Sequence, residues 1–260
     1  MAAASPNEAG GWYPVALSGG VPTGTSNGTH LLGEEIVVWR DGEGAPHVWE
    51  DRCPHRGMRL SFGFVRRDRI ACLYHGWQYG TDGRCLAIPA HPDLKVPPTI
   101  TVWKHSCHEA LGMIWAHLRE ATDPLSLPDD IDGGAFLPVR SIHVDCPAET
   151  LAEAFASSEP LAFNYGGPDP DPARSVRRIG PLVIMTIPKG PFGDTLAAGV
   201  QPLSANRSAL HLLVAVADEE QEYIDQARLH YARFAEGLRD RLERDAVESR
   251  KLRATGSDLR

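Results

Sequence analysis

Two short stretches decide the fold, Cys53-Pro54-His55 and Cys72-Leu73-Tyr74-His75. The first reads C-x-H and the second C-x-x-H, and the sixteen residues from 56 to 71 separate them. Thiolate and imidazole are side chains that bind transition metals. Because each stretch offers one of each, the pattern predicts a metal centre with two sulfur and two nitrogen ligands.

The ligand set points to one kind of metal centre. In a Rieske [2Fe–2S] cluster, two cysteines hold one iron and two histidines hold the other, which raises the reduction potential above that of all-cysteine clusters. A structural zinc site is the alternative, but zinc fingers usually open with C-x₂₋₄-C and close with paired histidines. We therefore predict a Rieske cluster that moves single electrons, with Cys53, His55, Cys72 and His75 as its ligands.

Composition limits the remaining possibilities. The chain has 260 residues, is 42% hydrophobic and carries a formal net charge of −8, which speaks against nucleic acid as a partner. No stretch approaches the roughly 18 apolar residues of a membrane span, and residues 1–11 lack the features of a signal peptide. We expect a cytoplasmic protein with no membrane association, whose other cysteines are free thiols: Cys85, Cys107 and Cys146.

The pattern of elements predicts an α+β protein with two domains. Short apolar strands with Gly and Asp turns predict an all-β domain over residues 12–120, and turn-forming residues predict a linker over 122–138. The second domain, 139–260, is expected to hold a short helix at 149–158, strands at 182–187 and 210–217, and a long helix at 219–252. Apolar residues of that long helix recur every three or four positions: Ile224, Ala227, Tyr231, Phe234, Leu238, Leu242 and Ala246.

With these residues in view, the chain resembles the Rieske non-haem iron oxygenases, especially the vanillate and dicamba demethylases and the pheophorbide oxygenase group. The likeness is strongest up to residue 118. It rests on Trp12-Tyr13-Pro14-Val15, Leu31-Leu32-Gly33-Glu34, Arg52-Cys53-Pro54-His55-Arg56-Gly57, Tyr74-His75-Gly76-Trp77 and Gly112-Met113-Ile114-Trp115.

The resemblance implies that the second domain is a shortened helix-grip fold, an antiparallel sheet with a long C-terminal helix. In the family this domain binds one mononuclear iron through two histidines and a carboxylate, with the signature N-x-x-D-x-x-H-x₄-H. The matching segment here is 152–166. In that register Ala154 replaces the asparagine, Ser157 the bridging aspartate, Pro160 the first histidine and Tyr165 the second.

These replacements predict that the mononuclear iron site is degenerate and that the iron is absent. Proline has no donor atom and serine does not replace the carboxylate, whereas the phenolate of Tyr165 can bind ferric iron. Asp245 resembles the third ligand as a vestige, or is an ordinary surface residue beside Arg241 and Ser249. A site rebuilt from other residues would use Asp245 with the histidines His143, His211 and His230.

Three functions follow from the resemblance, and no catalytic residue is assigned in any of them. The first is an oxidoreductase component that takes electrons from a reductase or ferredoxin and passes them to a mononuclear iron on a partner chain, in a trimeric homo- or hetero-oligomer. Arg56, beside His55, is a candidate docking residue for the donor, or a plain surface arginine. The second is a self-contained oxygenase, a hydroxylase or demethylase of a small molecule, with a rebuilt metal site. The third is a structural, pocket-forming homologue.

Overall fold

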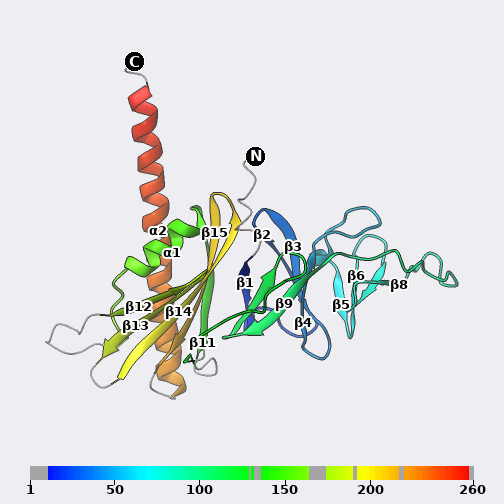
Figure 1. Ribbon diagram of the computed structural model, residues 1–260, viewed down its shortest axis with the longest axis horizontal. Helices are drawn as coiled ribbons and strands as arrows, with labels where there is room; N and C mark the ends of the chain where they lie inside the picture. The colour runs from blue at the N-terminus through cyan, green and yellow to red at the C-terminus, as the bar shows by residue number, and fades with distance from the viewer. Residues whose placement is uncertain are drawn as a thin grey trace. The chain divides into compact units, whose positions relative to one another are not determined.

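The structure, a computed structural model, divides into two compact units (Figure 1). Unit 1 is Met1–Pro128 and unit 2 is Asp129–Arg260. The residues that the structure describes are 11–128, 130–131, 136–163, 174–189, 192–216 and 220–257. No helix among them has an apolar stretch long enough to span a membrane.

Unit 1 is built on a six-stranded antiparallel sheet with the order β1-β10-β9-β4-β3-β2. Its strands are β1 (Trp12–Leu17), β2 (Ser26–Leu31), β3 (Glu34–Arg40), β4 (Pro46–Glu50), β9 (Lys104–Ala110) and β10 (Met113–His117). Side chains alternate between the two faces of a strand. In β3, Ile36 and Val38 enter one core while Val37 and Trp39 enter a second, so this strand joins two cores.

The second core of unit 1 lies under a smaller sheet with the order β5-β6-β7-β8. Its strands are β5 (Phe64–Arg66), β6 (Arg69–Ala71), β7 (Gln78–Gly80) and β8 (Cys85–Ala87). Two 3-10 turns, η1 (Ser18–Gly20) and η2 (Leu60–Phe62), complete the unit. The two Cys/His stretches therefore occupy the loop before η2 and the loop between β6 and β7.

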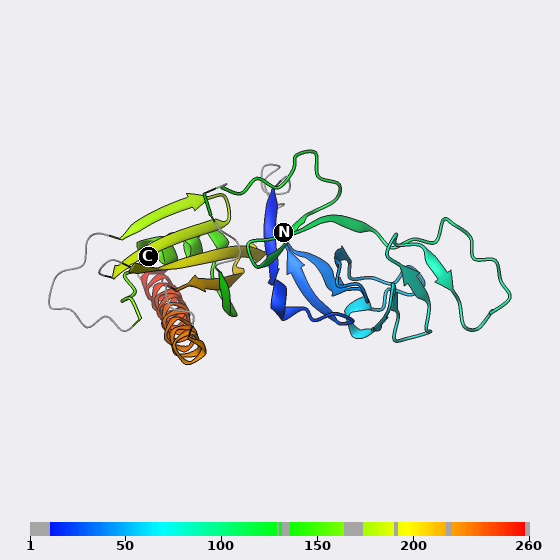
Figure 2. The same cartoon turned by 90° about the horizontal axis from the view of Figure 1, so that it is seen from below.

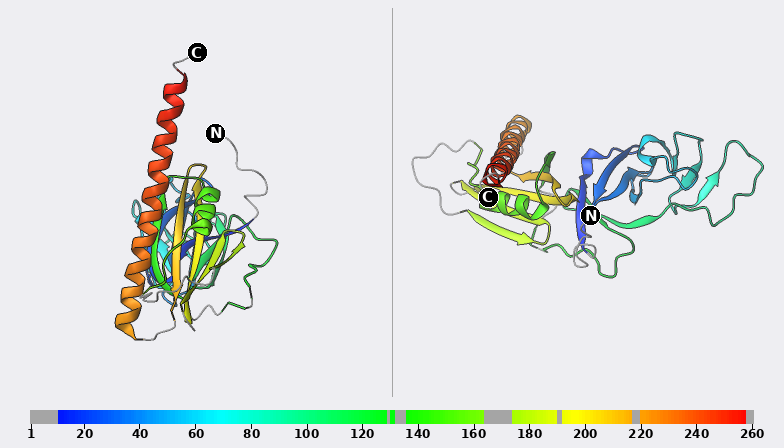
Figure 3. Two further views of the ribbon diagram at one scale, coloured as in Figure 1. Left: turned by 90° about the vertical axis from the view of Figure 1, so that its left-hand side faces the viewer. Right: turned by 90° about the horizontal axis from the view of Figure 1, so that it is seen from above.

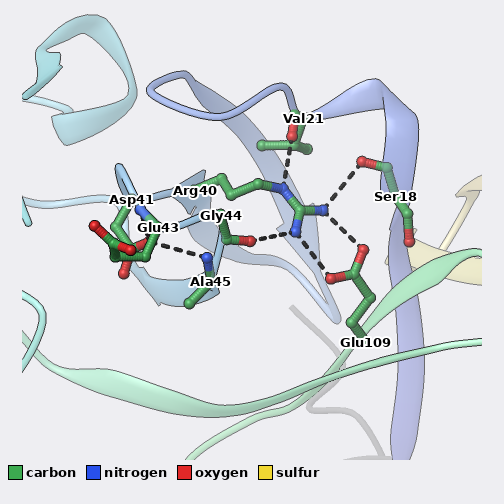
Figure 4. A network of polar contacts seen from close by, with 8 residues as sticks. All are labelled: Ser18, Val21, Arg40, Asp41, Glu43, Gly44, Ala45 and Glu109. Atoms are coloured by element: carbon green, nitrogen blue, oxygen red, sulfur yellow. Dashed lines mark hydrogen bonds and ion pairs between the residues drawn. The ribbon is translucent and has the colours of Figure 1, made fainter. Parts of the chain in front are cut away.

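A buried arginine ties three separate parts of unit 1 together (Figure 4). Arg40 is 8% exposed, and its guanidinium donates to both carboxylate oxygens of Glu109, at 2.8 and 2.9 Å. The same group donates to the backbone carbonyls of Ser18, Val21 and Gly44. A planar guanidinium with five donors suits this arrangement, which a lysine would not reproduce.

In its described ranges, unit 2 is a five-stranded antiparallel sheet with two helices. The strand order is β11-β15-β14-β13-β12. Residues of both helices share one hydrophobic core with the sheet, and Figures 2 and 3 show the two helices packed against it. The elements are β11 (Leu137–Val144), α1 (Ala148–Ser157), β12 (Ser175–Ile179), β13 (Leu182–Lys189), β14 (Phe192–Ser204), β15 (Arg207–Ala215) and α2 (Gln221–Ser257). The predicted fold class, an N-terminal β domain followed by an antiparallel sheet with a long C-terminal helix, is confirmed.

Helix α2 packs through the stripe that its sequence predicts. Ala227, Tyr231 and Leu238 are buried, and Ala235 joins them. The helix continues to Ser257, five residues beyond the predicted end, and its C-terminal part extends past the sheet (Figure 1). The sequence of this extension is rich in charged residues, so helical propensity supports it rather than core packing.

Candidate metal centre

The first ligand loop is a tight turn closed by two backbone hydrogen bonds. The Cys53 N–H donates to the Met58 carbonyl at 2.8 Å, and the Gly57 N–H donates to the Cys53 carbonyl at 2.8 Å. Gly57 has φ +72°, a conformation that side chains other than glycine's rarely adopt. The turn exposes Pro54 and brings His55 to a half-buried position.

The second ligand loop repeats this construction. The Cys72 N–H donates to the Trp77 carbonyl at 2.9 Å, and the Gly76 N–H donates to the Cys72 carbonyl at 3.0 Å. Gly76 has φ +70°, nearly the same as its counterpart in the first loop. Each loop therefore holds a cysteine at its start and a left-handed glycine four residues later, although the histidine is two residues after the cysteine in one loop and three in the other.

The two loops bring their histidines together. The ring centroids of His55 and His75 are 4.7 Å apart. Trp77 stacks on His55 with ring centroids 4.2 Å apart and an interplanar angle of 5°, and Tyr74 lies 3.8 Å from His75. These aromatic contacts fix the imidazole rings in orientation, and His75 remains exposed at the surface.

The two thiols lie deeper than the imidazoles. Cys53 is 2% exposed and Cys72 is 3% exposed. Burial raises the pKa of the Cys72 thiol, opposed by hydrogen bonds from the backbone N–H groups of Tyr74 and His75, and the adjacent Cys53 raises it further. Metal ions bind thiolates, so metal binding at this site releases protons. The backbone N–H groups of Tyr74 and His75 then face a negatively charged sulfur.

Tyr79 contributes a contact that the sequence did not reveal. Its side chain is fully buried, and its hydroxyl lies 3.0 Å from the Cys53 sulfur. Burial, with Cys53 next to it, raises the pKa of Tyr79 far above its usual value, so the hydroxyl keeps its proton. It can therefore donate to the sulfur once Cys53 is a thiolate.

A carboxylate clamp holds the base of the first loop. Asp51, 2% exposed, accepts hydrogen bonds from the Ser61 backbone N–H at 2.7 Å and from the Ser61 hydroxyl at 2.6 Å. The clamp joins the two ends of the loop that spans residues 52–60. Gly28 makes room for it, because a Cβ atom there would lie 2.6 Å from the Ser61 hydroxyl.

The chemistry of these donors fits a two-iron cluster. Two buried thiols lie next to each other and two imidazoles lie next to each other, as a [2Fe–2S] group with sulfur on one iron and nitrogen on the other requires. Across the ranges that the structure describes, no group of three or more His, Cys, Asp or Glu side chains is placed to hold a single metal ion. All five cysteines are free.

In unit 2, the positions expected from the second-domain signature lie at and after the end of α1. Ala154 packs against the core, whereas Ser157 is exposed and its hydroxyl donates to the Glu153 carbonyl of its own helix at 2.8 Å. Pro160 is half-buried in the segment that follows. Tyr165 lies outside the described residues.

Asp245 lies on the exposed part of α2, far along the helix from that segment. One link between this segment and α2 is His230, whose Nε2 lies 2.9 Å from the Leu161 carbonyl oxygen. Asp245 is fifteen residues beyond His230, which is about 22 Å along a helix axis. The structure therefore does not bring Asp245 to Pro160, the other described position in the predicted ligand set.

A buried carboxylate that the sequence did not reveal holds the segment after α1. Asp194, on β14, is 2% exposed and accepts hydrogen bonds from the Tyr231 hydroxyl at 2.5 Å and from the Phe163 backbone N–H at 2.9 Å. These partners lie 37 and 31 residues away in the chain. No local pattern could have indicated them.

The remaining histidines of unit 2 have separate surroundings. His211 is buried, and its two ring nitrogens lie 2.7 Å from the Ser141 hydroxyl and 2.8 Å from the Gln201 side-chain oxygen. Burial lowers the pKa of His211 to about 3, so this ring is neutral. Burial also lowers the pKa of His143. His211 is therefore a satisfied core residue.

Comparisons with known proteins indicate which class of domain has this geometry. Residues 11–98 match the model of the Rieske [2Fe-2S] domain family. The matched part of unit 1 is therefore similar to Rieske [2Fe-2S] domains, the class of domain that the paired loops indicate.

Over most of its length the chain has the fold of a solved monooxygenase. The crystal structure of apo dicamba monooxygenase aligns with a TM-score of 0.74 over 97% of this chain and 90% of that one, at 17% identity. Among curated relatives, the oxidoreductase NdmD of Pseudomonas putida is 39% identical over 122 residues, 46% of this chain and 21% of the relative. The oxygenase component of chloroacetanilide N-alkylformylase from Rhizorhabdus wittichii is 39% identical over 145 residues, 52% of this chain and 40% of the relative. The matches thus span well under half of these relatives.

Proposed function

We propose that this chain is an electron-transfer component of a Rieske-type oxygenase system. In this proposal Cys53, His55, Cys72 and His75 hold the cluster. Electrons arrive from a reductase or ferredoxin and leave to a mononuclear iron on a partner chain, within a trimeric homo- or hetero-oligomer. The observation that carries the proposal is the pair of matched loops, with buried thiols and with imidazoles at the surface.

Different side chains have different roles at the site. When bound, the cluster supplies one-electron chemistry. The buried cysteines and Tyr79 exclude water from the sulfur side, and Trp77 orients His55. The exposed His75 would offer an electron a path between the cluster and a partner at the surface.

Unit 2 supports the assignment of the mononuclear iron to a partner chain. The Ser157 hydroxyl is bonded to its own helix and Pro160 has no donor atom, so neither of these two positions supplies a ligand. In this proposal Asp245 is a vestigial ligand of the mononuclear iron.

The first test counts iron and acid-labile sulfide per chain after anaerobic purification. Two irons with two sulfides are expected for a Rieske cluster and no further iron. Sedimentation of the chain alone and with a candidate oxygenase chain tests the assembly. Less than two irons and two sulfides in protein whose loops are intact would contradict the proposal.

A ligand substitution tests the residue assignment. His75→Cys should lower the reduction potential toward the all-cysteine range of about −400 mV, because thiolate stabilises the oxidised iron. His108→Cys is the matched control, since His108 is an exposed histidine outside both loops. An unchanged potential and spectrum in His75→Cys would remove His75 from the ligand set.

A self-contained oxygenase is the second candidate, because the fold aligns over 97% of this chain with a monooxygenase. This candidate requires a mononuclear iron in unit 2, and the same analysis would then give three irons with two sulfides. That result would direct substrate screening to this chain alone.

A further inference from the structure

A hollow of about 410 Å³ lies in unit 1 where β4 ends and β9 begins. The Glu50 N–H donates to the Trp103 carbonyl at 2.9 Å, and the register of the two strands sets Val48 opposite His105. Side chains two residues apart on a strand point to the same face, so Trp103 and His105 share one side of the sheet. Glu50, Trp103 and His105 all line the hollow.

His105 brings a hydrogen-bond donor without an acceptor to this hollow. The residue is 8% exposed, and its Nδ1 accepts a hydrogen bond from the Arg119 backbone N–H at 2.9 Å. Burial lowers the pKa of His105 to about 4, and the charges of Arg119 and His117 add to this effect. The ring is therefore neutral and carries its single proton on Nε2.

This Nε2 atom is buried and has no hydrogen-bond partner in the part of the chain that the structure describes. Buried polar groups nearly always have a partner, so an exception requires an explanation. Because His105 lines the hollow, a ligand that carries an acceptor oxygen would supply the missing partner.

The charged side chains of the hollow leave one negative and one positive group unpaired. Arg119 pairs with Glu34 at 3.5 Å, and Glu35 pairs with Arg59. Glu50 and Arg52 are exposed and line the same hollow. Among the described residues they form no ion pair or side-chain hydrogen bond, either with each other or with another group. A single ligand with both charges would satisfy both side chains.

Trp103 supplies an apolar wall. Its side chain is 55% exposed, which is unusual for so large an aromatic residue. The guanidinium carbon of Arg119 lies 5.7 Å from the centre of the indole ring, so the ring also has a charged neighbour that helps to hold it. The indole surface that remains open suits a flat apolar group.

From these features we propose that the hollow binds the zwitterion of an aromatic α-amino acid. The ligand's carboxylate accepts hydrogen bonds from Arg52 and from the His105 Nε2–H, and its ammonium group pairs with Glu50. The aromatic ring of the ligand packs on Trp103. Each group of the ligand thus meets a group of the hollow that otherwise has no partner, and this binding activity lies beyond electron transfer.

Simpler ligands fit the hollow less well. An anion without an ammonium group would leave Glu50 unpaired and would be repelled by it. A cation without a carboxylate would leave both Arg52 and the His105 N–H without an acceptor. A metal ion does not suit His105, because the proton on Nε2 occupies the lone pair that a metal would need.

The test measures binding of L-phenylalanine to the cluster-loaded chain by calorimetry. We expect one site per chain with a Kd of about 1 mM or tighter. Two analogues separate the ligand's charges: 3-phenylpropionate lacks the ammonium group and 2-phenylethylamine lacks the carboxylate. Each analogue should bind at least roughly tenfold more weakly than L-phenylalanine, since it leaves a charged side chain of the hollow unpaired.

Two variants assign the charges of the ligand to the side chains. Glu50→Gln should weaken L-phenylalanine at least about tenfold and leave 3-phenylpropionate unchanged. Arg52→Gln should weaken L-phenylalanine by a similar factor and leave 2-phenylethylamine unchanged. Glu43→Gln and Arg66→Gln are the matched controls, because both residues are exposed in unit 1 and neither lines the hollow. Both controls should bind like wild type.

Two further variants test the wall and the buried donor. Trp103→Ala should weaken all three aromatic compounds, whereas Phe62→Ala, which removes an equally exposed aromatic ring elsewhere in unit 1, should not. His105→Phe keeps a ring but removes the Nε2–H, so it should weaken both carboxylates and leave 2-phenylethylamine unchanged. Glu50 and Trp103 lie outside both ligand loops, so the proposal stays testable if Arg52→Gln loads its cluster poorly.

Four results would overturn the proposal. The first is no binding of L-phenylalanine to wild type at about 10 mM. The second is binding of either analogue as tight as that of L-phenylalanine, which would indicate a plain anion or cation site. The third is unchanged binding in both Glu50→Gln and Trp103→Ala, and the fourth is an equal loss in the matched controls. Iron and sulfide content, measured on the same samples, judges the proposed function separately.

Discussion

Single side chains around the cysteines set the properties of the centre, and Tyr79 is the clearest case. Its hydroxyl contacts the Cys53 sulfur at 3.0 Å from a fully buried position. Reduction adds negative charge to a cluster, so a hydrogen bond to its sulfur ligand stabilises the reduced form and raises the potential.

Tyr79→Phe should therefore lower the reduction potential of the loaded protein. A hydrogen bond worth about 1 kcal/mol corresponds to roughly 40 mV for one electron. Potentiometric titration measures this shift. Tyr231→Phe is the matched control, because that hydroxyl is also buried and bonded but lies in unit 2. An equal shift in both variants would show that the contact with Cys53 is not the cause.

Tyr231→Phe should itself lower the stability of unit 2 by about 1–2 kcal/mol, because Asp194 loses a donor in a buried site. Within the described residues both α-helices belong to unit 2, so helical circular dichroism during urea unfolding reports this unit. Tyr223→Phe, in the first turns of α2, offers a comparison at a half-buried tyrosine. Equal stability of wild type and Tyr231→Phe would mean that Asp194 finds another donor.

His211 predicts a loss of stability in acid. Its folded pKa of about 3 lies below the ordinary 6.5, so the unfolded chain binds a proton more readily as the pH falls. The free energy of unfolding should then decrease by about 1.4 kcal/mol per pH unit below pH 6.5, down to about pH 3. Urea unfolding at pH 7.5 and 5.5 measures this slope. His211→Gln should be less stable at pH 7.5 but should have a shallower slope, and an unchanged slope would exclude His211 as its source.

At the scale of elements, the two ligand loops depend on one backbone conformation used twice. Gly57 and Gly76 both have positive φ, and both donate to the carbonyl of the cysteine four residues earlier. The same turn thus presents a cysteine and a histidine in each loop.

Gly76→Ala should reduce cluster content, because an alanine is strained at φ +70° and its Cβ would lie 3.1 Å from the Cγ atom of Pro89. Gly24→Ala is the control, since Gly24 has φ +77° but nothing within 4 Å of an added Cβ. The ratio of cluster absorbance to protein measures the outcome. Equal loss in both variants would point to general destabilisation rather than to the ligand loop.

How far the sequence predicts each element depends on how local its cause is. The spacing of Cys53, His55, Cys72 and His75 is local, and the structure places the two histidines side by side and the two thiols next to each other. The apolar stripe on α2 also follows from local sequence, and its residues Ala227, Tyr231 and Leu238 are buried. Asp194 could not be predicted, because its partners lie more than thirty residues away. The placement of Asp245 likewise depends on which turn of α2 meets the segment after α1, which periodicity does not specify.

At the scale of the whole molecule, the two units give separate optical signals. All six tryptophans lie between residues 12 and 115, in unit 1, and the described α-helices lie in unit 2. All four proposed ligands also lie in unit 1. Unfolding of the two units can therefore be followed in one sample.

Removing the cluster with a chelator under reducing conditions should lower the unfolding midpoint seen by tryptophan fluorescence more than the midpoint seen by helical circular dichroism. Metal binding contributes to folding when the ligands come together only in the folded state. Mock-treated protein is the control. An unchanged fluorescence midpoint would mean that the loops keep their structure without metal.

The pairing of β1 with β10 has a consequence for how such a protein evolves. Trp12 lies opposite His117, so unit 1 starts and finishes on neighbouring strands of one sheet. A module whose two ends emerge side by side can be spliced into longer polypeptides as a cassette without opening its sheet.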